Sequence, residues 1–222
     1  LADAIHRANV DPTIRAICLS GEGKGFCAGN DLGDFMNAPE MTPTSPVLRF
    51  LKAVSTCSVP IVAAVHGAAV GVGTTVLLHC DLIYASPTTK FALPFVNLGL
   101  VPEAASSLLL PRIMGHARAA ELILLGDVFS AEKALNYGLI NEIVEDETLL
   151  ERAWDIARQL SEKPPSSLKR SRELLRRATS QEVQTTMTAE VEHFTSQLTG
   201  PEAKEAFSAF FEKRKPDFSS FS

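Results

Sequence analysis

The sequence has no excess of basic residues, and this excludes several classes of partner. Its 222 residues contain 21 lysines and arginines against 26 aspartates and glutamates, which gives a formal net charge of −5 at pH 7. A protein that holds nucleic acid or an anionic membrane usually presents a basic surface that neutralises phosphate groups. We therefore expect neither nucleic acid nor a membrane as a partner.

Cysteine is scarce, and no two cysteines form a C-x-x-C pair. The four present are Cys18, Cys27, Cys57 and Cys80. Isolated cysteines of this kind are common core residues in reducing compartments, so we expect no disulfide framework and a cytoplasmic location. The chain begins at Leu1 within a helical pattern, which leaves open whether an N-terminal targeting signal precedes it.

Long apolar runs are also missing. The segment Pro60–Leu78 has no Asp, Glu, Lys or Arg, but three glycines, His66 and two threonines interrupt it. A membrane-spanning helix needs stronger apolar character than such a segment supplies. The pattern favours a buried strand, a glycine loop and then a buried helix.

Several familiar catalytic motifs are absent. The five histidines do not recur at metal-ligand spacing, and no G-x-S-x-G motif indicates a serine nucleophile. The segment Gly71–Val76 resembles a dinucleotide fingerprint only weakly, and Ser20–Phe26 lacks the spacing of a phosphate-binding loop. We expect no metal and no redox cofactor.

The order of apolar runs predicts an α/β core followed by helices. Short buried strands are expected at Ile14–Leu19, Ile61–Val65, Asp81–Ala85 and Phe91–Leu93. Such wholly apolar strands are typical of sheets that are covered on both faces. Helices should dominate after residue 100, with a first one starting at Pro102 and three amphipathic ones at Ser167–Arg177, Gln181–Leu198 and Pro201–Arg214.

Asn37–Pro46, with three prolines in ten residues and no period, predicts a mobile surface loop. Apolar residues that flank it are candidates for the wall of a ligand tunnel, although core packing is the commoner role for such residues. They are Phe35, Met36, Met41, Phe50 and Leu51.

Two glycine-bearing loops, Gly25–Leu32 and His66–Gly73, each follow an apolar strand. Small residues let a ligand approach backbone N–H groups closely. Two such amides that point at one carbonyl oxygen form an oxyanion hole, which contributes roughly 3 kcal/mol for each donor. The alternative is a pair of ordinary tight turns.

Longer motifs identify a family resemblance. They are Gly25–Leu32, Pro60–Gly67 with the glycine loop after it, Cys80–Ala85, Leu98–Glu103, Leu110–Arg112, Gly138–Ile140 and Phe210–Pro216. In order and spacing they resemble the crotonase (enoyl-CoA hydratase/isomerase) superfamily over nearly the whole chain, without that family's first β-hairpin. The resemblance implies an α/β spiral of repeated ββα units (the ClpP/crotonase-like fold) over residues 1–145, which holds the acyl-CoA site. Residues 146–222 would form a helical trimerisation region, which gives a homotrimer or a dimer of trimers.

The resemblance also implies an acyl-CoA thioester substrate and a set of site residues. The backbone N–H groups of Ala28 and Val72 would form the oxyanion hole. Substrate would lie along Ala28, Gly29, Asn30, Asp31 and Leu32, with Gly71 nearby. Coenzyme A would be part of the substrate and not a cofactor.

The resemblance also narrows the reaction. Family hydratases orient water with two glutamates, and the corresponding positions here are Thr75 and Phe95, neither of which can act as a base near neutral pH. Glu103 then becomes the candidate for a single base that shifts a 3-enoyl-CoA to a 2-enoyl-CoA, a step of fatty acid β-oxidation. A helix start at Pro102 would lower the Glu103 pKa, and apolar surroundings would raise it. Another crotonase reaction such as hydration or isomerisation of a ring-opened aromatic acyl-CoA, and a non-catalytic acyl-CoA-binding role, stay open as alternatives.

Overall fold

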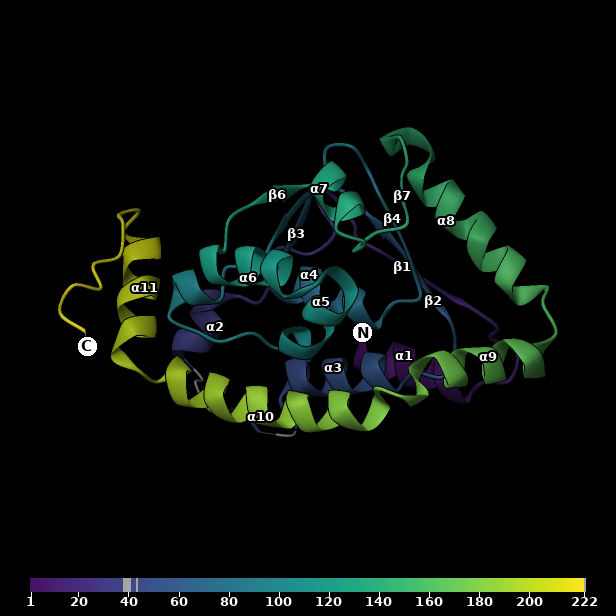
Figure 1. The fold of residues 1–222 in the computed structure, drawn as a ribbon, viewed down its shortest axis with the longest axis horizontal. Helices are drawn as coiled ribbons and strands as arrows, with labels where there is room; N and C mark the ends of the chain where they lie inside the picture. The colour runs from purple at the N-terminus through teal and green to yellow at the C-terminus, as the bar shows by residue number, and fades with distance from the viewer. Residues whose placement is uncertain (38–40, 43, 222) are drawn as a thin grey trace.

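The structure is a computed structural model that describes residues 1–37, 41–42 and 44–221 (Figure 1). The helices are α1 (Ala2–Val10), α2 (Leu32–Asn37), α3 (Pro46–Thr56), α4 (Val72–Thr75), α5 (Ser106–Met114), α6 (His116–Leu125), α7 (Ala131–Asn136), α8 (Asp146–Ser161), α9 (Pro165–Arg177), α10 (Ser180–Leu198) and α11 (Pro201–Phe211). Two short 3₁₀ helices, η1 (Val76–His79) and η2 (Val96–Leu98), complete the helical elements that are described. No helix in the described part of the chain is both long and apolar enough to cross a membrane.

The strands form two sheets. A parallel four-stranded sheet has the order β1 (Ile17–Ser20), β2 (Ile61–Val65), β4 (Leu82–Ala85) and β7 (Glu142–Ile143). A smaller sheet has the order β3 (Ala68–Val70), β5 (Lys90–Ala92) and β6 (Phe129–Ser130), in which β3 and β5 are parallel and β6 is antiparallel to β5.

The two sheets are linked by a repeated path of the chain. β2 in the first sheet leads through His66 and Gly67 to β3 in the second, and α4 and η1 then return the chain to β4. β4 leads in the same way to β5, so each turn contributes one strand to each sheet followed by helical residues. This is the predicted crotonase spiral of ββα units.

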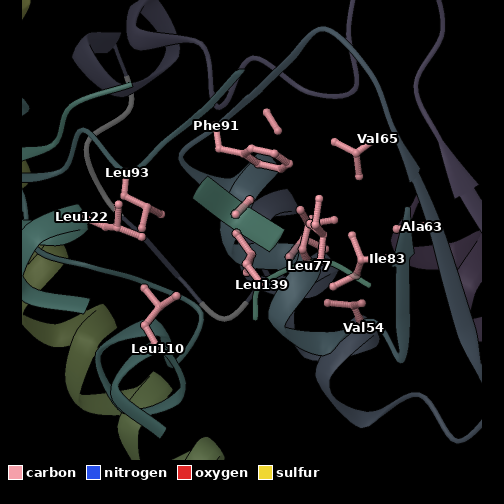
Figure 2. Packing of buried hydrophobic residues seen from close by; sticks show 14 of the residues in the cluster. Val54, Ala63, Val65, Leu77, Ile83, Phe91, Leu93, Leu110, Leu122 and Leu139 are labelled. Carbon is pink, nitrogen blue, oxygen red and sulfur yellow. The ribbon is translucent and has the colours of Figure 1, made fainter. Parts of the chain in front are cut away.

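Alternation along the central strands explains why they are apolar on both faces. In β2 the side chains of Val62 and Ala64 pack with α8, whose buried residues include Ala153. The intervening residues of β2 face the opposite way, into the main core between the sheets, as expected for a side-chain period of two. Figure 2 shows Ala63 and Val65 there together with Leu77 and Phe91.

α9 and α10 run along the lower edge of the core in the view of Figure 1, and α11 stands at the left end. α10 contacts α5, α9 and α11, and α11 contacts α2 and η2. The ring of Phe35 in α2 lies 5.8 Å from that of Phe194 in α10 and 6.5 Å from that of Phe207 in α11, measured between centroids. These aromatic contacts hold the end of the chain against the segment that follows the first glycine loop.

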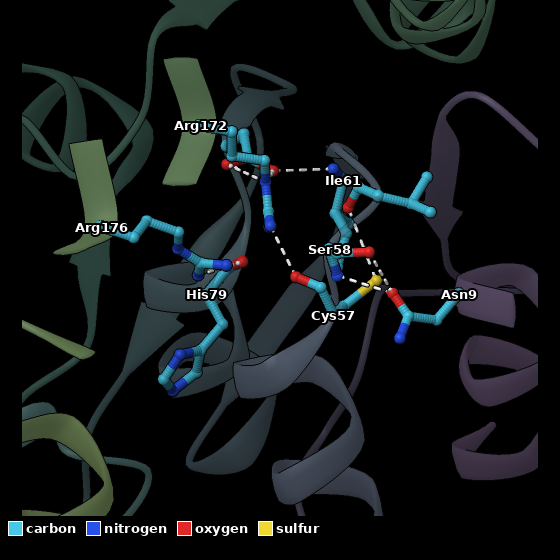
Figure 3. Close-up of polar contacts among 9 residues, drawn as sticks. Asn9, Cys57, Ser58, Ile61, His79, Arg172 and Arg176 are labelled. Atoms are coloured by element: carbon cyan, nitrogen blue, oxygen red, sulfur yellow. Dashed lines mark hydrogen bonds and ion pairs between the residues drawn. The ribbon is translucent and has the colours of Figure 1, made fainter. Parts of the chain in front are cut away.

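A buried ion pair fastens α9 to the sheet (Figure 3). The Arg172 Nε donates to both carboxylate oxygens of Asp81, at 2.8 and 2.9 Å, and Asp81 accepts in turn from the backbone N–H of Ile61 at 2.8 Å. Arg172 also donates to the Cys57 carbonyl oxygen, and Arg176 donates to that of His79. α9 therefore contributes polar contacts where the loops before β2 and β4 meet.

The start of α5 and the second glycine loop differ from the sequence predictions. α5 begins at Ser106 and not at Pro102, because Ala104 and Ala105 adopt left-handed backbone conformations with φ of 59° and 57° that a helix cannot contain. The glycine loop His66–Gly73 is not a continuous loop, since its middle residues form β3 by pairing with β5. Of the loop expected at Asn37–Pro46, the two end residues belong to α2 and α3, and residues 38–40 and 43 lie outside the described residues.

Candidate active site

The two glycine-bearing loops lie side by side. Cys27 forms an isolated parallel bridge with Ala69, in which the Cys27 N–H donates to the Ala68 carbonyl oxygen at 3.0 Å and the Cys27 carbonyl oxygen accepts from Val70 at 2.9 Å. The approach is so close that a Cβ at Gly73 would collide with the backbone of Cys27. The small residues of these loops are therefore required for the two backbones to meet.

This pairing places Ala28 and Val72 in one cavity of about 450 Å³. Within the described residues, the N–H groups of Ala28 and Val72 have no protein acceptor. Gly71, with a φ of 55°, turns the chain so that its own N–H donates to Ala92 and its carbonyl oxygen accepts from Thr74 and Thr75. Val72 is then the first residue of α4, where a backbone N–H has no partner within the helix.

The rest of the cavity is mostly apolar. Its lining includes every residue that the sequence proposed for substrate binding, from Ala28 to Leu32 and Gly71. Asp31 is exposed, and its carboxylate accepts from the Gly33 N–H at 2.7 Å at the start of α2, so it faces solvent and the helix end. The remaining lining residues are Phe35, Val70, Pro94, Phe95, Leu98, Leu100, Glu103, Phe194, Phe210 and Phe211.

Glu103 lies in this cavity and is 5% exposed. Thr75 donates a hydrogen bond to its carboxyl group at 3.1 Å. Burial raises the pKa of Glu103 from its ordinary value of 4.5 to about 7, the Thr75 hydrogen bond opposes this increase, and the nearby charge of Glu190 adds to it. The sequence predicted that burial and a helix start would shift the Glu103 pKa in opposite directions. Burial outweighs the helix start, because Glu103 precedes α5 and does not lie in its first turn.

The backbone that carries Glu103 is unusual. Two consecutive alanines, Ala104 and Ala105, are left-handed, a conformation that costs a non-glycine residue roughly 1–2 kcal/mol each. The Ala104 carbonyl oxygen accepts from the His79 Nε2 at 2.8 Å. Burial lowers the pKa of His79 to about 4, so at neutral pH the imidazole is uncharged. His79 therefore acts on this turn as a neutral donor.

Glu190 contacts the same turn from α10. Its carboxylate accepts from the Ala105 N–H at 2.6 Å, from the Ser107 N–H at 3.0 Å and from the Ser107 hydroxyl group. Sequence reasoning missed this residue, although a signal for it exists. Buried or half-buried side chains of α10 recur at Val183, Met187, Glu190, Phe194 and Leu198, so one acid stands within an otherwise apolar stripe at helical spacing.

Of the two positions that family hydratases would use for their glutamates, one is hydrogen-bonded to Glu103 and the other lines the same cavity. Thr75 is fully buried and bound to its carboxyl group, and Phe95 is 5% exposed and lines the cavity. Of the residues proposed as a tunnel wall, Phe35 lines the cavity, whereas Leu51 packs in the core with Val72 and Ala104. Phe194, Phe210 and Phe211 form part of the wall from the C-terminal helices, which sequence spacing did not indicate.

Comparison with known proteins agrees with these features. The family described as enoyl-CoA hydratase/isomerase matches residues 1–220. A crystal structure of an enoyl-CoA hydratase/isomerase from Pseudoalteromonas atlantica superimposes with a TM-score of 0.94 at 49% identity, over 98% of this chain and 87% of that one.

Curated relatives carry different activities in their names. The 1,2-epoxyphenylacetyl-CoA isomerase of Escherichia coli is 36% identical over 98% of this chain and 86% of its own length. Enoyl-CoA delta isomerase 2 of Rattus norvegicus is 35% identical over 78% of this chain and 46% of its own length. The chain belongs to the enoyl-CoA hydratase/isomerase family, the crotonase superfamily, and acts on acyl-CoA thioesters of that family's kind.

Proposed function

We propose that the protein is an acyl-CoA double-bond isomerase that shifts a 3-enoyl-CoA to a 2-enoyl-CoA with Glu103 as its single base. The observation that carries this proposal is that Glu103 is the one buried carboxyl group among the described residues that line the apolar cavity. Thr75 is bound to it, and Phe95 lies in the same lining, in place of further acids. A base performs best when its pKa lies near the working pH, and the Glu103 pKa of about 7 meets that condition.

The proposed reaction moves one proton across the substrate. The Glu103 carboxylate removes a proton from C2, and the electron pair left behind forms a dienolate with the thioester oxygen. The N–H groups of Ala28 and Val72 stabilise the negative charge on that oxygen. Glu103 then returns the proton to C4, which leaves the double bond between C2 and C3. No metal or redox cofactor takes part, because the thioester itself makes the C2 proton acidic.

Hydration is disfavoured by the same residues. Adding water across a double bond requires that the water be oriented and deprotonated while the α-carbon is protonated, and family hydratases divide this work between two glutamates. Here the second acidic group has no counterpart among the described residues of the cavity lining, since Asp31 is exposed and its carboxylate accepts from Gly33.

A second candidate reaction is isomerisation of a ring-opened aromatic acyl-CoA. Five phenylalanines line the cavity, and aromatic rings favour contact with other rings. The similarity to the 1,2-epoxyphenylacetyl-CoA isomerase supports the same candidate. Comparing turnover of a phenyl-bearing and a straight-chain 3-enoyl-CoA of similar length would rank the two.

The test of the main proposal uses two substrates and one variant. Purified protein is mixed separately with a 3-enoyl-CoA and a 2-enoyl-CoA, and both the absorbance of the conjugated thioester and the product mass are followed. We expect conjugation from the first substrate and no mass gain from the second. A product of the second substrate that is heavier by one water, or no reaction with either substrate, contradicts the proposal.

The variant Glu103→Gln tests whether Glu103 is the base. It should lower kcat by about 10²- to 10⁴-fold while acyl-CoA binding, measured by calorimetry with a saturated acyl-CoA, stays within a few fold. Equal turnover by the variant would remove Glu103 from the mechanism.

We also propose a homotrimer or a dimer of trimers in the cytoplasm, on the strength of the family resemblance and of the four free thiols. Light scattering coupled to size exclusion measures the first, because a trimer of 23.9 kDa chains is three times heavier than a monomer.

A further inference from the structure

The turn that carries Glu103 is stabilised from outside its own segment. Ala105 stands at the N-cap position of α5, and an alanine side chain cannot accept a hydrogen bond from the free N–H groups of a helix start. The Glu190 carboxylate of α10 occupies that role, since it accepts from the N–H groups of Ala105 and Ser107. The cap of α5 is thus supplied by a residue more than eighty positions later in the chain.

We propose that Glu190 is a positioning residue for the reaction, which caps α5 in place of Ala105 and so fixes the Ala104–Ala105 turn that aims the Glu103 carboxyl group into the cavity. The proposal rests on the proposed function in one respect, namely that Glu103 is the base. Glu190 itself does not line the cavity and does not touch the substrate space.

Burial raises the pKa of Glu190, and the hydrogen bonds from Ser107 and Ala105 oppose this increase by favouring the charged form. Both backbone partners are N–H groups, which can only donate, and the Ser107 hydroxyl group adds a further donor. A carboxylate accepts all three, whereas a neutral side chain that must also donate cannot. Position at the start of α5 favours negative charge as well, because the helix dipole presents its positive end there.

The same helix contributes to the cavity wall. Phe194 lies one turn after Glu190 on the same side of α10, and it lines the cavity that Glu103 occupies. α10 therefore supplies both the acid that holds the turn and a ring that encloses the substrate.

Few other titratable groups face Glu103. Among the described residues, Glu190 approaches from α10, the uncharged His79 approaches the turn from η1, and Asp31 stands exposed on the segment before α2. Glu190 is the one of these whose charge raises the Glu103 pKa. Removing that charge should therefore lower the Glu103 pKa, whereas loss of a cap whose charge does not reach Glu103 would leave that pKa unchanged.

The first experiment compares two substitutions with opposite defects. Glu190→Gln keeps the length of the side chain and removes its charge, while Glu190→Asp keeps the charge and shortens the reach by one methylene group. Glu192→Gln, on the exposed side of the same helix, is the matched control. The kcat and KM of the wild type and the three variants are measured on a 3-enoyl-CoA from pH 5 to 9.

We expect Glu190→Gln to lower kcat about tenfold with KM within about twofold, and to move the acid limb of the kcat profile to lower pH. Glu190→Asp should lower kcat without moving that limb, and Glu192→Gln should match the wild type. Wild-type kcat and an unmoved limb in Glu190→Gln would overturn the proposal. An increase in KM with an unchanged kcat would also overturn it.

The variant Ser107→Ala keeps the proposal testable if Glu190→Gln folds poorly. Ser107→Ala removes one donor to Glu190 on an exposed residue, and we expect a two- to threefold loss in kcat with an unchanged KM. An unchanged kcat in this variant would count against positioning by Glu190.

Infrared titration separates this proposal from the function on which it rests. The carboxyl band of protonated Glu103 is identified by its loss in Glu103→Gln, and its titration needs no substrate. A Glu103 band that titrates at lower pH in Glu190→Gln supports the link between the two residues even if no enoyl-CoA is turned over, in which case the proposed function alone fails. An unmoved band, with isomerisation intact, means that the positioning role alone fails.

Discussion

The hydroxyl group of Thr75 donates a hydrogen bond to the carboxyl group of Glu103 at 3.1 Å, between two side chains that are almost completely buried. Thr75 belongs to α4, which also begins with the backbone amide of Val72. One short helix therefore presents both the amide proposed to bind the substrate oxygen and a hydroxyl donor to the proposed base. In the proposed reaction, the Val72 amide stabilises the charge on the thioester oxygen, and the Thr75 hydroxyl group contacts the base.

Thr75→Val should shift the pH dependence of catalysis. The hydrogen bond lowers the Glu103 pKa by stabilising its charged form, so the loss of the bond raises that pKa above its present value of about 7. The acid limb of kcat then moves to higher pH, and activity falls more at pH 6 than at pH 9. Thr75→Ser retains the hydroxyl group and serves as the control. Identical acid limbs in Thr75→Val and the wild type would refute the predicted shift.

Glu103→Gln should stabilise the fold at alkaline pH. The carboxyl group ordinarily titrates near 4.5 and in the folded protein at about 7, so between these values the folded protein binds a proton that the unfolded chain has lost. The free energy of unfolding therefore decreases as pH rises through this interval, by about 3 kcal/mol at most. Glutamine does not carry this penalty.

Urea unfolding at pH 8.5 and at pH 4.5 measures the difference. We expect the variant to be more stable than the wild type at pH 8.5 and nearly equal to it at pH 4.5. A stability difference between variant and wild type that is the same at both pH values would show that the buried acid carries no such penalty.

Ala105→Gly should stabilise the protein. Ala105 has a φ of 57°, which glycine adopts without strain, and relief of this strain outweighs the greater freedom of glycine in the unfolded chain. We expect a gain of about 0.5–1 kcal/mol in the free energy of unfolding. Ala134→Gly, at a buried helical position of α7, is the control and should lose stability. Equal losses in the two variants would contradict the strain argument.

Arg172→Met should be strongly destabilising without changing catalysis. It removes the partner of Asp81 from a pair in which the arginine side chain is 8% exposed, so a carboxylate is left poorly compensated. Breaking a buried pair in this way costs about 3 kcal/mol. Arg170→Met breaks the exposed pair with Glu173 and should have no measurable effect on the melting temperature. A change in kcat for the folded Arg172→Met protein would argue against a structural role.

The central strands could be predicted well from the sequence, for a physical reason. β2 occupies Ile61–Val65 as expected, because a run of apolar residues bounded by Pro60 and the glycines after it has few other stable conformations. The same holds for the cavity, where the proposed substrate-binding residues are found together. Their functional roles, the division at residue 145 and the oligomeric state stay predictions.

The surroundings of Glu103 could not be predicted, because non-local contacts determine them. A proline followed by an acid is a common helix start, yet α5 begins four residues later, since His79 and Glu190 compensate for an unfavourable alanine pair. Neither residue is near Glu103 in sequence, and no local propensity reports such a contact. The phenylalanines contributed by α10 and α11 were missed for the same reason.

The dependence of the Glu103 turn on α10 also sets an order of events during synthesis of the chain. A nascent polypeptide that has just completed α7 already contains every strand of both sheets except β7, together with Glu103 and both glycine loops. It lacks the carboxylate that accepts from Ala105, which emerges only with α10. Growing and prematurely terminated chains lack this carboxylate and also the part of the cavity wall that Phe194, Phe210 and Phe211 form. We therefore expect them to turn over substrate more slowly than chains that extend through α11.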